Sequence, residues 1–147
     1  MTLQKFNTIV FLGKRNKMLN FKISELIHSD TAIKHRINNM PDINSLDCLL
    51  NLIVYCLQPL RDKIKKPVII TSGYRNAEVN RLVGGASTSQ HTKGQAADIK
   101  VSGMTPSKLY TYILNSGIEY DQLILEPSWV HISYNRGRNR KEYFVQK

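Results

Sequence analysis

The sequence has few cysteines, which argues against a disulfide-built scaffold. Among 147 residues there are two, Cys48 and Cys56. They are eight positions apart in an apolar pattern with helical spacing, so their Cα atoms would lie about 12 Å apart, too far for a disulfide. We therefore expect buried free thiols, as in a reducing cytosol.

Long hydrophobic runs are also missing. The apolar stretch Phe6–Gly13, "FNTIVFLG", is too short to span a bilayer. Basic residues follow this stretch instead of preceding it, so it is a poor signal peptide. We expect no transmembrane segment and no export signal.

Acidic residues are few: the sequence has 11 Asp and Glu and 21 Lys and Arg, which gives a net charge of +10. This balance favours polyanionic partners such as nucleic acid, anionic lipid or an anionic wall polymer, although it also fits a simple solvated basic surface. The basic cluster Arg136–Lys141 has little aromatic interleaving and no nucleic-acid recognition motif, so no specific nucleic-acid binding is expected.

Repeats, low-complexity stretches and linkers are absent, and the length suits one domain. We expect an N-terminal extension over 1–20 and a single domain over 21–147. Helical patterns come first and strand patterns later, which predicts an α+β fold with a small antiparallel sheet packed against helices. Helices are expected near 24–36, 43–64, 76–83 and 105–116, and strands near 67–72, 96–101, 121–126, 129–134 and 142–146.

Several of these boundaries carry local signals. Ser24, and Ser29 or Asp30, are candidate N-caps of two short helices. The helix near 105–116 has Thr105 at its N-cap, Pro106 at its first position and Gly117 after its end. Pro59 should kink the long helix or end it early.

The segment "SQHTKGQAADIK", Ser89–Lys100, places one imidazole and one carboxylate seven positions apart, His91 and Asp98. A catalytic zinc usually takes three protein ligands. A third could come from His131 in "WVHIS", in the middle of a predicted strand, although a single strand histidine is more often a hydrogen-bonded structural residue. His28 and His35 have no carboxylate at a comparable spacing and are expected to be surface or helix-packing residues.

Three motifs in order resemble a known family. They are Ser72-Gly73-Tyr74-Arg75; Ser89, His91, Gly94, Ala96 and Asp98 in the pattern S-x-H-x-x-G-x-A-x-D; and Trp129 with His131 in W-x-H. Over about 21–134 the chain resembles zinc D-alanyl-D-alanine carboxypeptidases and phage (endolysin-like) peptidoglycan peptidases. These share their fold with the hedgehog signalling domain and the vancomycin-resistance dipeptidases.

The resemblance implies that His91, Asp98 and His131 bind Zn²⁺, and that Arg75 binds a substrate carboxylate or peptide carbonyl. Independently, the planar guanidinium fork matches a carboxylate, although a surface salt bridge is an alternative for Arg75. Ser89 is expected to hydrogen-bond substrate or only to shape its loop.

The general base departs from the family pattern, in which an acidic residue stands three positions before the last ligand. Here that position is Ser128. Glu126 stands five before His131 and is expected to be the base, or else a solvated strand-end carboxylate. Asp121 lies farther back, is expected to point to the opposite face of its strand, and would more naturally pair with a basic residue.

The resemblance implies a zinc peptidase that hydrolyses peptidoglycan peptides near a D-alanine, as a carboxypeptidase or an endopeptidase, and we expect it to be a monomer. The protein would stay in the cytoplasm until it is released to the cell wall. The alternative is a degenerate member of the same fold that only binds a wall peptide or a protein. Whether the origin is a phage, a prophage or a cell stays open.

Overall fold

The N-terminal segment forms a small hairpin. The structure, a computed structural model, describes residues 9–12 and 15–147. Strands β1 (Ile9–Leu12) and β2 (Arg15–Met18) pair antiparallel. Much of the apolar run Phe6–Gly13 lies outside the described residues, so the expected extension over 1–20 stays a prediction.

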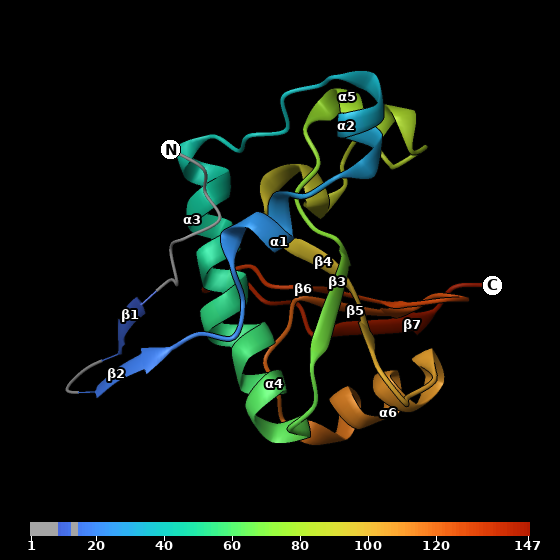
Figure 1. Ribbon diagram of the computed structural model, residues 1–147. Coiled ribbons are helices and arrows are strands. Elements are labelled where there is room, and N and C mark those ends of the chain that lie inside the picture. Colours follow the sequence, from blue (N-terminus) through green and yellow to red (C-terminus); the bar gives the residue numbers. More distant parts are fainter. Residues whose placement is uncertain (1–8, 13–14) are drawn as a thin grey trace.

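Helices and strands follow the expected order (Figure 1). The helices are α1 (Ile23–Ile27), α2 (Asp30–His35), α3 (Ile43–Leu52), the π-helical turn η2 (Ile53–Leu57), α4 (Gln58–Ile64), α5 (Ala77–Leu82), the 3₁₀ turn η3 (Gln90–Lys93) and α6 (Pro106–Ser116). The main strands are β3 (Val68–Ser72), β4 (Ala96–Val101), β5 (Gln122–Leu125), β6 (Val130–Ser133) and β7 (Glu142–Val145).

The helix caps expected from the sequence are present in the structure, with one exception. Thr105 accepts a hydrogen bond from the backbone of α6, and Gly117 closes that helix with a φ of 75°. Ser29 caps α2 in the same way. The expected cap at Ser24 is wrong, because α1 begins at Ile23, so that Ser24 lies inside the helix and the N-cap is Lys22.

The long helical segment continues past Pro59, so of the two expected effects, a kink or an early end, the early end is wrong. Proline has no N–H and its ring crowds the carbonyl four residues back. The turn just before it is π-helical, and Gln58 N–H donates to the carbonyl of Ile53. This wider turn shifts the hydrogen-bonding register immediately before proline, so that the helix reaches Ile64.

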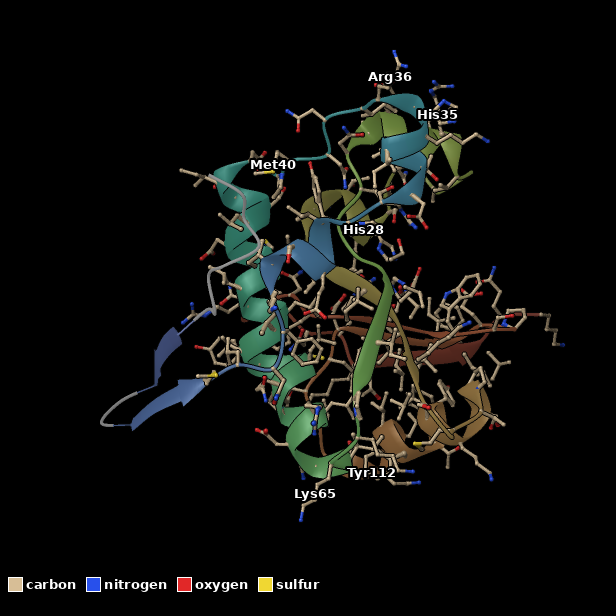
Figure 2. The ribbon with its side chains drawn as sticks, viewed as in Figure 1. His28, His35, Arg36, Met40, Lys65 and Tyr112 are labelled. Atoms are coloured by element: carbon tan, nitrogen blue, oxygen red, sulfur yellow. The ribbon has the colours of Figure 1, made fainter. Side chains whose placement is uncertain are left out.

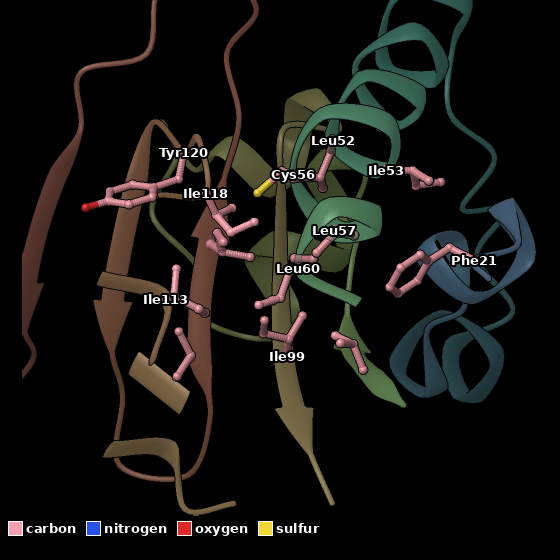
Figure 3. Close-up of a cluster of buried hydrophobic side chains, with 14 of the residues drawn as sticks. Phe21, Leu52, Ile53, Cys56, Leu57, Leu60, Ile99, Ile113, Ile118 and Tyr120 are labelled. Atoms are coloured by element: carbon pink, nitrogen blue, oxygen red, sulfur yellow. The ribbon is translucent and has the colours of Figure 1, made fainter. Parts of the chain in front are cut away.

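That segment, Ile43–Ile64, is also the one helix among residues 18–147 that is long and apolar enough to cross a membrane by length and composition. Although Ile43 at its start is exposed, its side chains Leu52, Ile53 and Leu57 are fully buried. Figure 3 shows them in one cluster of buried hydrophobic side chains that also contains Ile99 of β4, with Ile53 on the side of the helix toward Phe21. The helix therefore builds the core, which supplies the hydrophobic stabilisation of the fold.

The five main strands form a sheet in the order β3-β4-β6-β5-β7. The α+β fold is confirmed, with one difference from expectation. The first four strands pair antiparallel, but β7 pairs parallel to β5, so the sheet is mixed. On β4, Ala97, Ile99 and Val101 join the core, and alternation turns Asp98 to the opposite face.

Candidate metal centre and cleft

Two strands at the centre of the sheet bring Asp98 and His131 together. Asp98 of β4 stands directly opposite His131 of β6 in the antiparallel register. Directly opposed residues share a face of the sheet, with Cβ atoms about 4.5–5.5 Å apart. Both side chains are buried, and His131 Nδ1 lies 3.1 Å from Asp98 Oδ1.

A tight 3₁₀ turn, η3, supplies His91. The turn closes at Gly94, which has a φ of 72° in the left-handed region. A Cβ at Gly94 would also overlap the backbone carbonyl of Ser45 in α3, so glycine is needed here for both conformation and space. The glycine of the quoted motif thus lets the turn pack against the core helix.

The two ring nitrogens of His91 have different partners. Nδ1 donates to the carbonyl of Gly73, 2.7 Å away. This leaves Nε2 facing the other two side chains, 3.2 Å from Asp98 Oδ1 and 3.3 Å from His131 Nδ1. A histidine held by a backbone carbonyl through one nitrogen is the usual arrangement for metal binding through the other.

The three converging atoms fit a metal ion. Their separations are 3.1, 3.2 and 3.3 Å. Ligands at 2.0–2.1 Å from a tetrahedral zinc lie about 3.3–3.4 Å from one another. A single proton cannot bridge all three pairs at once, whereas one cation between the atoms would. The donor set of two imidazoles and a carboxylate is therefore a candidate metal centre.

The charge of Asp98 supports the same assignment. Burial alone would raise the pKa of this carboxyl group, but the neighbouring imidazoles of His131 and His91 lower it by more. The net pKa of Asp98 lies well below its ordinary range. The side chain is therefore a carboxylate, the form that binds a metal.

Arg75 lies just beyond β3 and borders the centre. Its guanidinium donates to Ser72 Oγ at 3.2 Å and to Ser89 Oγ at 3.5 Å. Its Nε is buried and has no hydrogen-bond partner among residues 18–147. Burial lowers the pKa of Arg75, while the negative charge of Asp98 opposes that shift. No carboxylate pairs with the guanidinium in the described part of the chain, which leaves it available to an anionic ligand.

Glu126 follows β5 on the face of the sheet that carries His131. Ile124 pairs with His131, and Glu126 comes two residues after Ile124, so alternation keeps it on that face. Burial raises the pKa of Glu126; the charge of Asp98 raises it further and His131 lowers it.

Asp121 has a different environment. It is fully buried and forms an ion pair with Arg140, with Oδ2 2.7 Å from the guanidinium. Burial alone would raise the pKa of Asp121, but hydrogen bonds from Arg140 and Gln90 lower it below its ordinary range. The expected pairing with a basic residue is present, and this pairing makes Asp121 a structural group.

Arg75 and Glu126 line one cleft of about 1100 Å³ together with the three candidate ligands, and Asp121 lies outside its lining. Its walls include Arg75, Ser89, Glu126 and Trp129, with the three candidate ligands at its base. The other two histidines are exposed, near α2 in Figure 2: His28 hydrogen-bonds Asp30 at 2.9 Å, and His35 belongs to α2 itself.

Sequence reasoning did not assign a role to three residues that contact the site. Ser72 accepts a hydrogen bond from Arg75, and the carbonyl of Gly73 accepts one from His91. Both residues belong to the S-G-Y-R motif, so their place in that motif was the signal that could have identified them. Gln146 reaches the carboxylate of Glu126 from β7's end. Nothing in the sequence near Gln146 indicates that contact.

A buried His–Asp–His cluster in a cleft, beside an unpaired arginine and a carboxylate, is the site of a metal-dependent hydrolase. A comparison with protein-family models matches residues 19–133 to Peptidase M15. The match spans most of the chain, which therefore belongs to the peptidase M15 family, a family of metal-dependent peptidases, as its motifs predicted. No curated protein sequence matches the chain.

Proposed function

We propose that this protein is a zinc-dependent peptidase of bacterial peptidoglycan, cutting peptide bonds near a D-alanine as a carboxypeptidase or an endopeptidase. The observation that carries the proposal is the convergence of His91, Asp98 and His131 at the base of the cleft. Two imidazoles and one carboxylate are a donor set that suits zinc. When bound, zinc would polarise the scissile carbonyl and make water a stronger nucleophile at neutral pH.

The protein's own groups divide the remaining work. The Arg75 guanidinium, placed by Ser72 and Ser89, binds a carboxylate or carbonyl oxygen of the peptide and orients it over the cleft. Glu126 accepts the proton of the attacking water and passes it to the leaving amine. Its raised pKa improves the first of these two steps, the acceptance of the proton from water, because a carboxylate whose conjugate acid is weaker is a stronger base.

The remaining parts of the proposal concern the setting. The net charge of +10 favours retention at anionic wall polymers. We propose that the protein acts as a monomer, and that it stays in the cytoplasm until a phage-type or prophage-type lysis event releases it to the wall.

The test is a digest of purified peptidoglycan by the zinc-loaded protein, with mass analysis of the fragments. The wild-type protein should release fragments cut beside D-alanine, and their sizes distinguish a terminal cut from a cut inside a cross-link. Glu126→Gln should keep its fold and its zinc but lose about 10²- to 10⁴-fold in turnover.

Two results would contradict the proposal. Intact peptidoglycan after digestion by zinc-loaded wild-type protein would argue for a binding module. Near wild-type turnover in Glu126→Gln would remove the base role from Glu126 and leave a mechanism in which zinc and Arg75 act without a protein base.

A further inference from the structure

The carboxylate of Glu126 accepts hydrogen bonds from one side chain in the described part of the chain. Its backbone is fixed by the turn to β6, in which its N–H donates to the carbonyl of Trp129 at 3.0 Å. Among residues 18–147, whose side chains the structure describes, the one donor to its carboxylate is Gln146. With its amide nitrogen toward Glu126, Gln146 donates to Oε1 at 2.8 Å and to Oε2 at 3.2 Å. The opposite amide orientation would place oxygen against oxygen.

The parallel strand β7 brings Gln146 to this position. In the pairing of β7 with β5, the last pair of residues is Leu125 and Val145. The next residues along the chain are Glu126 after β5 and Gln146 after β7. The backbone N–H of Gln146 donates to the carbonyl of Leu125 at 2.9 Å, which fixes the register at the point of contact.

Packing does not explain why β7 is there. Its apolar side chains are largely exposed: Tyr143 by 61%, Phe144 by 44% and Val145 by 57%. The strand is instead attached by hydrogen bonds, including Glu142 N–H to the carbonyl of Asp121, next to the ion pair between Asp121 and Arg140. A strand that buries so little apolar surface contributes little to the core.

We propose that Gln146 is a positioning residue for catalysis, which holds the Glu126 carboxylate in the orientation that faces the metal centre. A half-buried glutamate can still rotate about three side-chain torsions, and two donated hydrogen bonds select one orientation. The inference rests on the proposed function, because it gives Gln146 a role only if Glu126 is the base. Gln146 lies beyond residues 19–133, the part of the chain that matches the family.

The experiment compares Gln146→Met, which keeps the length and removes the donors, with the wild type in zinc-loaded full-length protein. We expect kcat to fall about tenfold with little change in KM, because the hydrogen bond that is lost orients the charged base and does not bind substrate in this proposal. The acidic limb of the pH–rate profile should move to higher pH, since a carboxylate without donors is easier to protonate. Gln146→Glu should move it further, because two carboxylates then compete for one proton.

A matched control separates positioning from strand attachment. Gln122→Met makes the same change on β5, where the amide donates to Glu142 of β7 at 3.2 Å and not to Glu126. It should leave kcat and the pH profile as in the wild type. In the Glu126→Gln background, Gln146→Met should have no further effect on turnover, because its target has gone.

A readout without turnover keeps the inference separate from the proposed function. The Glu126 carboxyl carbon can be titrated by NMR in the folded wild type and in Gln146→Met. An upward shift of its pKa in the variant supports the contact whether or not the protein cuts peptidoglycan. Identical titrations would overturn it, as would a Gln146→Met effect of equal size in the Glu126→Gln background. If the zinc-loaded wild-type protein itself does not cut peptidoglycan, that result would instead count against the proposed function.

Discussion

Gly73 gives the sharpest test of how the metal centre is supported. Its carbonyl accepts the Nδ1 hydrogen bond of His91, and a Cβ at this position would overlap the backbone carbonyl of Leu26 in α1. The two segments are already tied by the bond from Tyr74 N–H to that same carbonyl. Because the overlap is with backbone, no change of rotamer relieves it, and Gly73→Ala must push the end of β3 away from α1.

The magnitude has two parts. Overpacking of this kind costs about 1–3 kcal/mol of folding free energy. Movement of the Gly73 carbonyl also weakens the hydrogen bond that orients His91, and loss of such support reduces metal affinity about 10- to 100-fold. That loss corresponds to about 1.4–2.8 kcal/mol of binding free energy.

Zinc affinity can be measured by competition with a chelating indicator, and stability by thermal unfolding of the metal-free protein. Gly117→Ala is the matched control, because Gly117 has a φ of 75° and open space around its missing Cβ. It should cost about 1 kcal/mol through backbone strain at the end of α6. Zinc affinity should be unchanged in that control.

Two outcomes would refute the reasoning. If Gly73→Ala is destabilised but binds zinc as tightly as the wild type, the carbonyl does not orient His91. If the variant is as stable as the wild type, the contact between β3 and α1 is looser than described.

Three further predictions follow from the site. His91→Ala and His131→Ala should each lose stoichiometric zinc in metal analysis, and retention of zinc by both would make the ligand assignment wrong. Arg75→Lys should lower kcat/KM on wall peptides while the melting temperature barely moves, because lysine keeps the charge and loses the planar fork; a large loss of stability with unchanged kinetics would support a structural role instead. Asp121→Asn should cost about 1–3 kcal/mol at pH 7, because Arg140 loses its charged partner. The lowered pKa of Asp121 means that this stabilisation is present above about pH 3.9 and is lost as pH falls below it, so the wild type and the variant should converge in acid denaturation.

Local sequence signals predicted much of the fold because each has a local physical cause. Thr105 and Gly117 mark the ends of α6 through a side-chain cap and a left-handed φ, neither of which depends on the rest of the chain. Alternation within β6 was enough to expect His131 on the face opposite Val130 and Ile132. The meeting of Asp98 and His131 then follows from one antiparallel register between β4 and β6, whereas His91 is brought in by the turn η3.

The features that the sequence did not reveal depend on contacts between distant segments. The helix passes Pro59 because the preceding turn can become π-helical while its apolar face stays on the sheet. The parallel pairing of β7 with β5 follows directly after the ion pair between Asp121 and Arg140, which joins residues 19 positions apart. The contact between Gln146 and Glu126 follows from that pairing, and no periodicity or local motif encodes it.

The turn between β5 and β6 has a consequence for how the chain can change in length. Pro127 and Ser128 are the two residues between the hydrogen-bonded pair Glu126 and Trp129. Surface loops generally accept insertions and deletions. An insertion here that shifted β6 by one residue would turn His131 toward the core and place an aliphatic neighbour in the cleft. Variation in the length of this turn should therefore be restricted to changes that preserve the strand register, and a single-residue insertion should abolish metal binding even where the protein still folds.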